Sequence, residues 1–361
     1  VKLTAQVKLV VTKSQAKALK ETLARANAAC NSISEWAWQN QTFGQYALHK
    51  GTYSATRAAF DLAAQVVVRC NAKVADAYKL DKRVQRTFKP DSAIAYDDRI
   101  LRWYVDKGEV SIWSVTGRLR LPFVCGDYQR GLLAFQQGES DLAFHGGNFF
   151  LLTTCNLPDP PLMETDGVLG VDLGIVNLAT DSEGRAYSGD AVKAVRRRAR
   201  RIRALLQSKG TKNAKRHLKR MGRRTANYQR WLNHNISQQL TQNALSSRKA
   251  LAMENLQGIR ERGNGFNRET RWQLGNWAFF QLQQFVCYKA KRAGIPVTFV
   301  DPRNTSRTCH ACGHCAKENR KSQSVFQCLS CGRVAKADEN AALNIAARGE
   351  VNRPIDAPAL G

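Results

Sequence analysis

The spacing of apolar positions changes twice in the first half of the chain. Residues 3–12 alternate between apolar and polar, as a β-strand does. Over 13–85 apolar residues recur at three- and four-residue steps, which predicts helices: one opens at the capping-box sequence Thr12-Lys-Ser-Gln15, and another covers about 54–82. From about 88 to 157 the period returns to two, with Gly, Asp and Asn turns. We therefore expect an antiparallel sheet or small β-barrel, joined by strand 3–12, with a helical module inserted.

A proline-rich stretch, residues 156–167, separates this half from an α/β pattern. The first apolar run after it, VLGVDLGIVNLAT (168–180), predicts a strand packed on both faces. It contains one acid, Asp172. Because a buried carboxylate is costly unless its charge is compensated, this position requires an explanation.

Two further acids occupy similar positions. Glu254 ends the apolar strand in RKALAMENLQGIR, and Asp338 starts the helical run DENAALNIA. A strand Asp, a strand-end Glu and a helix-start Asp provide the hard oxygen ligands that Mg²⁺ prefers. Two such ions ~4 Å apart can hydrolyse a phosphodiester, and their charge would neutralise the acids. The joint pattern therefore predicts a metal-dependent nuclease site.

Each acid also has an ordinary structural explanation when it is taken singly. Asp172 could be capped by backbone amides or paired with an arginine. Glu254 could be a surface acid at a strand end, and Asp338 a helix N-cap. Only the combination of the three favours catalysis.

The ten cysteines are unevenly distributed. Two CxxCG sequences, separated by fifteen residues, contain Cys309, Cys312, Cys328 and Cys331. This spacing predicts a zinc ribbon with four thiolate ligands, a closed structural site. Cys315, His310 and His314 lie nearby but fall outside the symmetric pairs. The other five cysteines are scattered among apolar neighbours, as buried thiols in a reducing compartment are.

Charge is the strongest compositional feature. The chain has a net charge of +27, and residues 191–253 contain eighteen Lys and Arg with no Asp or Glu. Such a surplus favours a nucleic-acid partner, with an acidic membrane surface as the alternative. KAVRRRARRIRALL predicts a helix with a narrow apolar stripe and a broad cationic surface. Trp272 and Trp277 are interpreted as helix core. The residues expected to contact phosphate are Arg196, Arg197, Arg200, Arg201, Arg203, Lys215, Arg216, Lys219, Arg220, Arg223, Arg224 and Arg307.

Taken in order, GVDLGIVNLAT, the arginine-rich helix, LAMENLQGI, the two CxxCG sequences and DENAALNIA resemble the TnpB proteins of insertion-sequence transposons. These proteins are compact relatives of type V CRISPR nucleases. The resemblance is specific over residues 168–348 and weaker in the N-terminal half. One departure is Lys336-Ala337 before Asp338, where relatives often carry an arginine.

The resemblance implies a multidomain α+β protein. Its parts would be a wedge-like β-barrel (1–12 and 86–160), a helical recognition module (13–85), an RNase H-like (RuvC) α/β nuclease domain (161–304 and 336–361) and a zinc-ribbon insertion that binds target nucleic acid (305–335). Asp172, Glu254 and Asp338 would be the catalytic acids, holding Mg²⁺ or Mn²⁺, and the four cysteines would hold one structural Zn²⁺.

It also implies a function. The protein would use a transposon-encoded guide RNA (omega RNA) to find double-stranded DNA next to a short adjacent motif, and would cut it by two-metal-ion hydrolysis. We expect one chain per RNA, no membrane association and a cytoplasmic, nucleoid-associated location, since residues 1–15 carry no hydrophobic leader. The alternatives are a catalytically silent RNA-guided repressor, a miniature type V CRISPR effector and, less favoured, a strand-transfer transposase.

Overall fold

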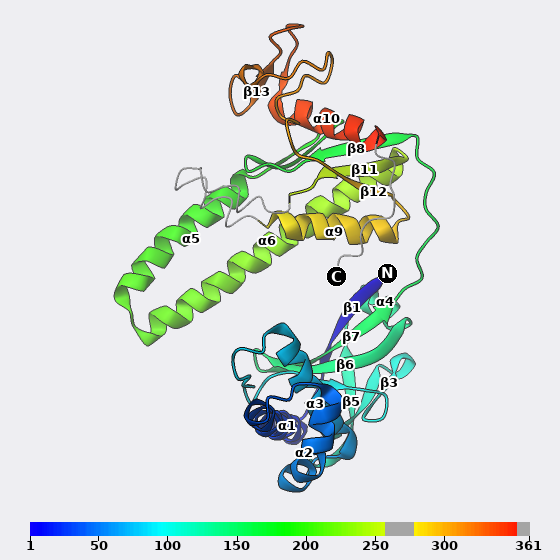
Figure 1. Cartoon of the computed structure of the whole chain (residues 1–361), viewed down its shortest axis with the longest axis vertical. Helices are drawn as coiled ribbons and strands as arrows, with labels where there is room; N and C mark the ends of the chain where they lie inside the picture. Colours follow the sequence, from blue (N-terminus) through cyan, green and yellow to red (C-terminus); the bar gives the residue numbers. More distant parts are fainter. Residues whose placement is uncertain (257–277, 352–361) are drawn as a thin grey trace. The chain divides into compact units, whose positions relative to one another are not determined.

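The computed structural model describes residues 1–256 and 278–351. The chain forms two compact units that divide between Pro158 and Asp159, inside the proline-rich stretch (Figure 1). Each unit has its own hydrophobic core.

The first unit contains a seven-stranded antiparallel sheet with the order β2-β6-β7-β1-β5-β4-β3. Its strands are β1 (Lys2–Leu9), β2 (Ile94–Tyr96), β3 (Leu101–Tyr104), β4 (Glu109–Ser114), β5 (Gly117–Val124), β6 (Gln136–His145) and β7 (Asn148–Asn156), with the short helix α4 (Asp127–Leu133) between β5 and β6. The sheet is nearly closed, because Trp103 Nε1 on β3 donates to Ser140 Oγ on β6 at 3.2 Å. As expected, the first strand joins it, pairing with β5 and β7.

Three helices lie between β1 and β2: α1 (Lys13–Gln39), α2 (Gln45–Phe60) and α3 (Ala64–Leu80). The Thr12–Gln15 capping box begins α1. The single helix expected over about 54–82 is wrong, since that segment forms parts of α2 and α3. The chain breaks at Asp61, which adopts a left-handed conformation with φ 48°. Apolar periodicity continues through the break, because Leu62 is buried in the same core.

The second unit contains a five-stranded sheet with the order β10-β9-β8-β11-β12. Its strands are β8 (Gly167–Asp172), β9 (Asn177–Asp181), β10 (Ala186–Ser188), β11 (Lys249–Glu254) and β12 (Val297–Val300). β8, β11 and β12 are parallel, whereas β9 and β10 are antiparallel to their neighbours. The run 168–180, expected as one strand, forms β8 and β9 with a turn between them.

Among the described residues of this unit, the helices beside the sheet are α5 (Asp190–Lys209), α6 (Lys212–Ser246), α9 (Phe279–Arg292) and α10 (Ala337–Val351). The helix α10 lies on one face of the sheet, while α6 and α9 lie on the other (Figure 1). A small two-stranded sheet, β13 (Val325–Gln327) with β14 (Val334–Lys336), precedes α10.

Small residues let α10 pack directly against the backbone of the sheet. A Cβ added at Gly170 on β8 would lie 2.1 Å from the carbonyl oxygen of Ala342 and 2.4 Å from the amide nitrogen of Ala346. At the other end of the helix, a Cβ on Gly349 would lie 2.6 Å from that of Ala252 on β11. This close approach sets where α10 begins relative to the ends of the strands.

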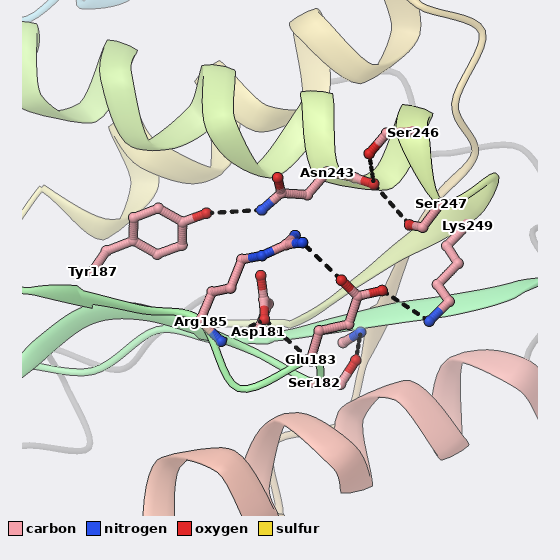
Figure 2. Close-up of polar contacts among 10 residues, drawn as sticks. Asp181, Ser182, Glu183, Arg185, Tyr187, Asn243, Ser246, Ser247 and Lys249 are labelled. Atoms are coloured by element: carbon pink, nitrogen blue, oxygen red, sulfur yellow. Dashed lines mark hydrogen bonds and ion pairs between the residues drawn. The ribbon is translucent and has the colours of Figure 1, made fainter.

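A polar network fixes the opposite face of the sheet to α6 (Figure 2). Tyr187 on β10 accepts a hydrogen bond from Asn243 Nδ2 on α6 at 3.1 Å. In the β9–β10 turn, Asp181 accepts from the backbone amides of Glu183 and Arg185, and Glu183 pairs with Lys249 of β11 at 3.0 Å. The helix α6 is thus held in a defined register on the sheet.

The packing of α10 predicts the effect of two glycine replacements. Gly170→Ala should destabilise the second unit by at least about 2 kcal/mol, because the new methyl group meets backbone that cannot move aside. Gly222→Ala on α6 is the control, since no atom lies within 4 Å of its added Cβ. It should leave stability unchanged or raise it by up to about 1 kcal/mol. Thermal unfolding checks both, and equal melting temperatures for the two variants would contradict this packing.

Candidate metal and nucleic-acid site

Asp172 and Glu254 end two neighbouring parallel strands. Met253 of β11 is paired with Val171 of β8, so the next residues along these strands, Glu254 and Asp172, lie side by side. Neighbouring strands are about 4.8 Å apart. Side chains two residues apart share a face of a strand, and Gly170 faces α10; therefore Asp172 faces α10 as well.

Asp338 approaches from the helix that covers this face. It lies in the first turn of α10, and its Oδ2 accepts a hydrogen bond from Asn177 Nδ2 at 2.9 Å. Asn177 is the first residue of β9, just beyond the turn that follows Asp172. The close packing of α10 on β8 thus brings Asp338 near enough for its charge to act on Asp172. The oxygens of the three acids do not all lie within 4.8 Å of one another, in contrast to the sulfurs of the cysteine group described below.

The buried Asp172 feels the charges of the other two acids. Burial raises the pKa of Asp172 well above its ordinary value, and the charges of Glu254 and Asp338 raise it further, while Arg320 opposes them. Burial also raises the pKa of Glu254, although a hydrogen bond from Thr305 Oγ1 at 2.5 Å favours its ionised form. Buried carboxylate oxygens with further acids beside them have the chemistry of a site for hard divalent cations.

Several polar residues that the sequence analysis missed surround these acids. Arg320 Nη2 lies 3.8 Å from Asp338 Oδ1, and Gln283 Nε2 of α9 donates to the carbonyl oxygen of Glu254 at 2.7 Å. With Thr305 and Asn177, they fix the orientation of the carboxylates. Nothing in the local sequence marks them, because each comes from a segment that meets the acids only in the folded chain.

The four expected cysteines come together. Their Sγ atoms all lie within 4.8 Å of one another, with Cys309 and Cys331 3.7 Å apart and Cys312 and Cys328 3.5 Å apart. Four sulfurs around a tetrahedral ion at about 2.3 Å would be about 3.8 Å apart. A backbone amide, that of Cys331, donates to Cys328 Sγ at 3.5 Å, which favours the thiolate. The group can therefore hold a metal ion.

Among the other candidates near the ribbon, Cys315 is exposed and is not part of the group of four. The carbonyl of His314 instead accepts from the amide of Cys309, and the amide of His310 donates to Asn340 on α10. The second of these contacts attaches the ribbon to the helix that carries Asp338. Because Arg320 lies in the same insertion, the ribbon also places a positively charged side chain beside Asp338.

Most of the expected phosphate-binding residues are exposed. On α5 and α6, exposed side chains are found at Arg197, Arg200, Arg201, Arg203, Lys215, Arg216, Lys219, Arg220, Arg223 and Arg224, and Arg307 is exposed before the ribbon. Arg196 differs, since it is half-buried and donates to Gln229 Oε1 at 2.7 Å, joining α5 to α6. Trp272, Trp277 and residues 352–361 of the expected nuclease region lie outside the described residues.

Within the described ranges, no helix combines the length and apolarity needed to cross a lipid bilayer.

Comparisons with known proteins identify two family domains. Residues 153–257 match the family described as "Probable transposase", and residues 279–345 match the family described as "Cas12f1-like, TNB domain". The "CRISPR-associated endodeoxyribonuclease Cas12f1" of Sulfoacidibacillus thermotolerans is 32% identical over 206 residues, which are 52% of this chain and 47% of that protein. A TnpB-like protein of Methanocaldococcus jannaschii is 37% identical over 112 residues, 31% of this chain and 40% of the relative.

The fold has a solved counterpart. The structure titled "Cryo-EM structure of the Cas12f1-sgRNA-target DNA complex" superimposes with a TM-score of 0.62 at 16% identity, covering 93% of this chain and 83% of that one. The sequence matches cover less than half of either curated relative. These partial matches confirm the resemblance to the TnpB family and extend it to the Cas12f1 proteins.

Proposed function

We propose that the protein is an RNA-guided DNA endonuclease of a transposon. It would take a guide RNA, find double-stranded DNA next to a short motif and hydrolyse phosphodiester bonds. The observation that carries this proposal is a buried Asp172 at the end of β8, with Glu254 and Asp338 near enough for their charges to raise its pKa. The relatives named as endodeoxyribonuclease and TnpB-like support it.

The finer fold assignment is part of the proposal. A hairpin of antiparallel strands, β10-β9-β8, followed by parallel β11 and β12, is the topology expected of an RNase H-like (RuvC) domain. This domain would comprise 161–304 and 336–361, with the ribbon at 305–335. The nearly closed first sheet would be the wedge (1–12 and 86–160), and helices α1 to α3 the recognition module (13–85).

In this mechanism the three acids would hold Mg²⁺ or Mn²⁺. Such ions, when bound, neutralise phosphate charge and make water a stronger nucleophile. The chain's own residues orient the site: Asn177 holds one oxygen of Asp338, whose other oxygen lies beside Arg320, and Thr305 holds one oxygen of Glu254. Arg320, beside Asp338, is placed to contact a phosphate oxygen of the strand to be cut.

The four cysteines would hold one Zn²⁺, which stabilises a loop that otherwise has a small core. That core comprises only Phe326, Ala337 and two of the cysteines themselves. The ribbon in turn positions Arg320, so the zinc supports catalysis from a distance. Along α5 and α6, the exposed arginines and lysines would bind nucleic-acid phosphates, which could belong to the guide RNA, to its duplex with DNA or to an opened DNA strand.

Two alternatives share this scaffold. The match to Cas12f1 favours a miniature CRISPR effector as the second candidate, and the chemistry would then be the same with a different source of guide RNA. A silent RNA-guided repressor is less favoured, because all three acids are present. Sequencing the RNA that co-purifies with the protein separates a transposon guide from a CRISPR guide.

The nuclease proposal predicts the effect of removing an acid. Asp172→Ala, Glu254→Gln and Asp338→Asn should each reduce cleavage of a matched plasmid at least about a thousandfold, since fewer cations are held at the reacting phosphate. Glu339→Gln, next to Asp338 on α10, is the matched control and should cut normally. Guide-RNA binding should be unchanged in all four. A rate for Asp172→Ala equal to that of the unaltered protein would disprove the assignment.

Carboxylate repulsion predicts that a neutral side chain stabilises the cation-free protein. Asp172→Asn should raise the melting temperature at pH 7, because it removes a buried carboxyl group whose ionisation is unfavourable. The raised pKa means that the unaltered protein loses stability as pH rises above about 4, so the difference should vanish near that pH. Mg²⁺ should then stabilise the unaltered protein more than the variant. The exposed Asp190→Asn is the control, and a lower melting temperature for Asp172→Asn would contradict this account.

The ribbon predicts the metal content of cysteine variants. Purified protein should contain about one zinc per chain, and Cys312→Ser should lose most of it because three thiolates bind less tightly than four. Cys315→Ser should retain its zinc, because Cys315 lies outside the group of four. Elemental analysis of both variants checks this. Equal zinc content in the two would refute the assignment of the ligands.

A further inference from the structure

The basic helix α6 carries an exposed aromatic pair that the proposed chemistry does not use. Trp231 is 57% exposed. Its ring lies nearly parallel to that of Tyr228, with centroids 5.9 Å apart and planes at 27°. Tyr228 is partly buried against the core of the second unit. The indole of Trp231 thus lies beside the partly buried ring of Tyr228, and more than half of the Trp231 surface remains in contact with solvent.

The surface around this pair is cationic. Arg220 and Arg224 precede Trp231 by eleven and seven residues, which places all three on one side of the helix. Both arginines are exposed, and neither pairs with an acid in the described part of the chain. From 191 to 253 the sequence offers no acid at all. An exposed tryptophan in line with free guanidinium groups fits a ligand that has both phosphates and flat rings.

The segment of α6 that carries the aromatic pair is also joined to α9 through hydrogen bonds. Asn233, two residues after Trp231, donates to the carbonyl of Ala278 at 3.3 Å and to Gln281 Oε1 at 3.1 Å, at the start of α9. From the same turn of α9, Gln283 donates to the backbone carbonyl of Glu254 at 2.7 Å. The turn of α6 that presents Trp231 to solvent is thus joined, on its buried side, to the helix that holds the backbone of Glu254.

We propose that Trp231, backed by Tyr228, is a stacking site for an unpaired base of the DNA strand that enters the catalytic site. The proposal rests on the proposed nuclease function and adds the form of its substrate: single-stranded DNA held by one base. Arg220 and Arg224 bind the backbone of that strand, and the indole face binds a base of any identity. Bases inside a duplex are already stacked, so the site selects strands that have been opened.

A binding measurement that needs no catalysis tests the stacking. The full chain, without divalent cations, is titrated with a fluorescent oligothymidine and with an abasic strand of the same length and charge. Trp231→Ala should weaken binding of oligothymidine by about 5- to 150-fold and leave the abasic strand unaffected. Trp231→Phe should retain most of the preference. Leu245→Ala, another exposed apolar residue of α6, is the matched control and should change neither affinity.

Contacts with the DNA backbone should give a different pattern of affinities in the same titration. Arg224→Ala should weaken binding of both strands equally and reduce the salt dependence, because it removes a phosphate contact and no base contact. Equal losses for Trp231→Ala on the two strands, or no loss on either, would overturn the stacking proposal. Unchanged melting temperatures for the variants exclude unfolding as the cause of any loss.

A crosslinking experiment tests that the base belongs to DNA. In the complex of the Asp172→Ala protein with its guide RNA and target, 5-iodouracil is placed in the DNA strands or in the RNA. Light should crosslink the α6 peptide containing Trp231 to DNA; crosslinking to RNA alone would overturn the assignment to DNA. The titration involves neither guide RNA nor cleavage, so the two proposals can fail separately. A stacking effect in a protein that cuts no DNA would refute the nuclease proposal alone. Cleavage by a protein with no stacking effect would refute the stacking proposal alone.

Discussion

The second unit depends on the contact between α10 and the bare backbone of β8. Gly170 has no side chain, so the helix lies against the strand itself, with Ala342 and Ala346 at the contact. A helix that packed at the usual separation would begin farther from the strand ends, and Asp338 would not reach them. The packing free energy of this interface therefore holds together carboxylates that repel one another. Fold stability and the capacity to bind cations are opposed at this point.

Other elements add to the site by means of backbone contacts and single polar side chains. The ribbon supplies Arg320, and α9 supplies Gln283, which donates a hydrogen bond to the backbone carbonyl of Glu254. The helix α6 is fixed to the sheet by Asn243 and to the start of α9 by Asn233. As a result the basic surface, the ribbon and the acids form one connected arrangement within the second unit.

Much of this organisation could be predicted from the sequence, because the relevant signals are local. Apolar alternation predicts the strands, CxxCG spacing predicts the cysteine group, and an acid at the end of a buried strand is conspicuous at Asp172. The two-helix character of 54–80 could not be predicted, since the apolar period continues through the left-handed turn at Asp61. Arg320, Thr305 and Asn177 were also missed, because common polar residues gain their roles only from tertiary contacts. Arg196 was expected at the surface, but its neighbour Gln229 on another helix holds it between α5 and α6.

The convergence of three distant acids around shared cations is the central claim, and it can be mapped directly. Fe²⁺ substituted for Mg²⁺ produces hydroxyl radicals in the presence of ascorbate and peroxide, and these cut polypeptide close to the bound ion. Mass spectrometry of the RNA-free protein should find cuts near the end of β8, the end of β11 and the start of α10 together, all suppressed by excess Mg²⁺ and all absent in Asp172→Ala. Cuts near one of these segments alone, or a pattern unaffected by Mg²⁺, would contradict the account.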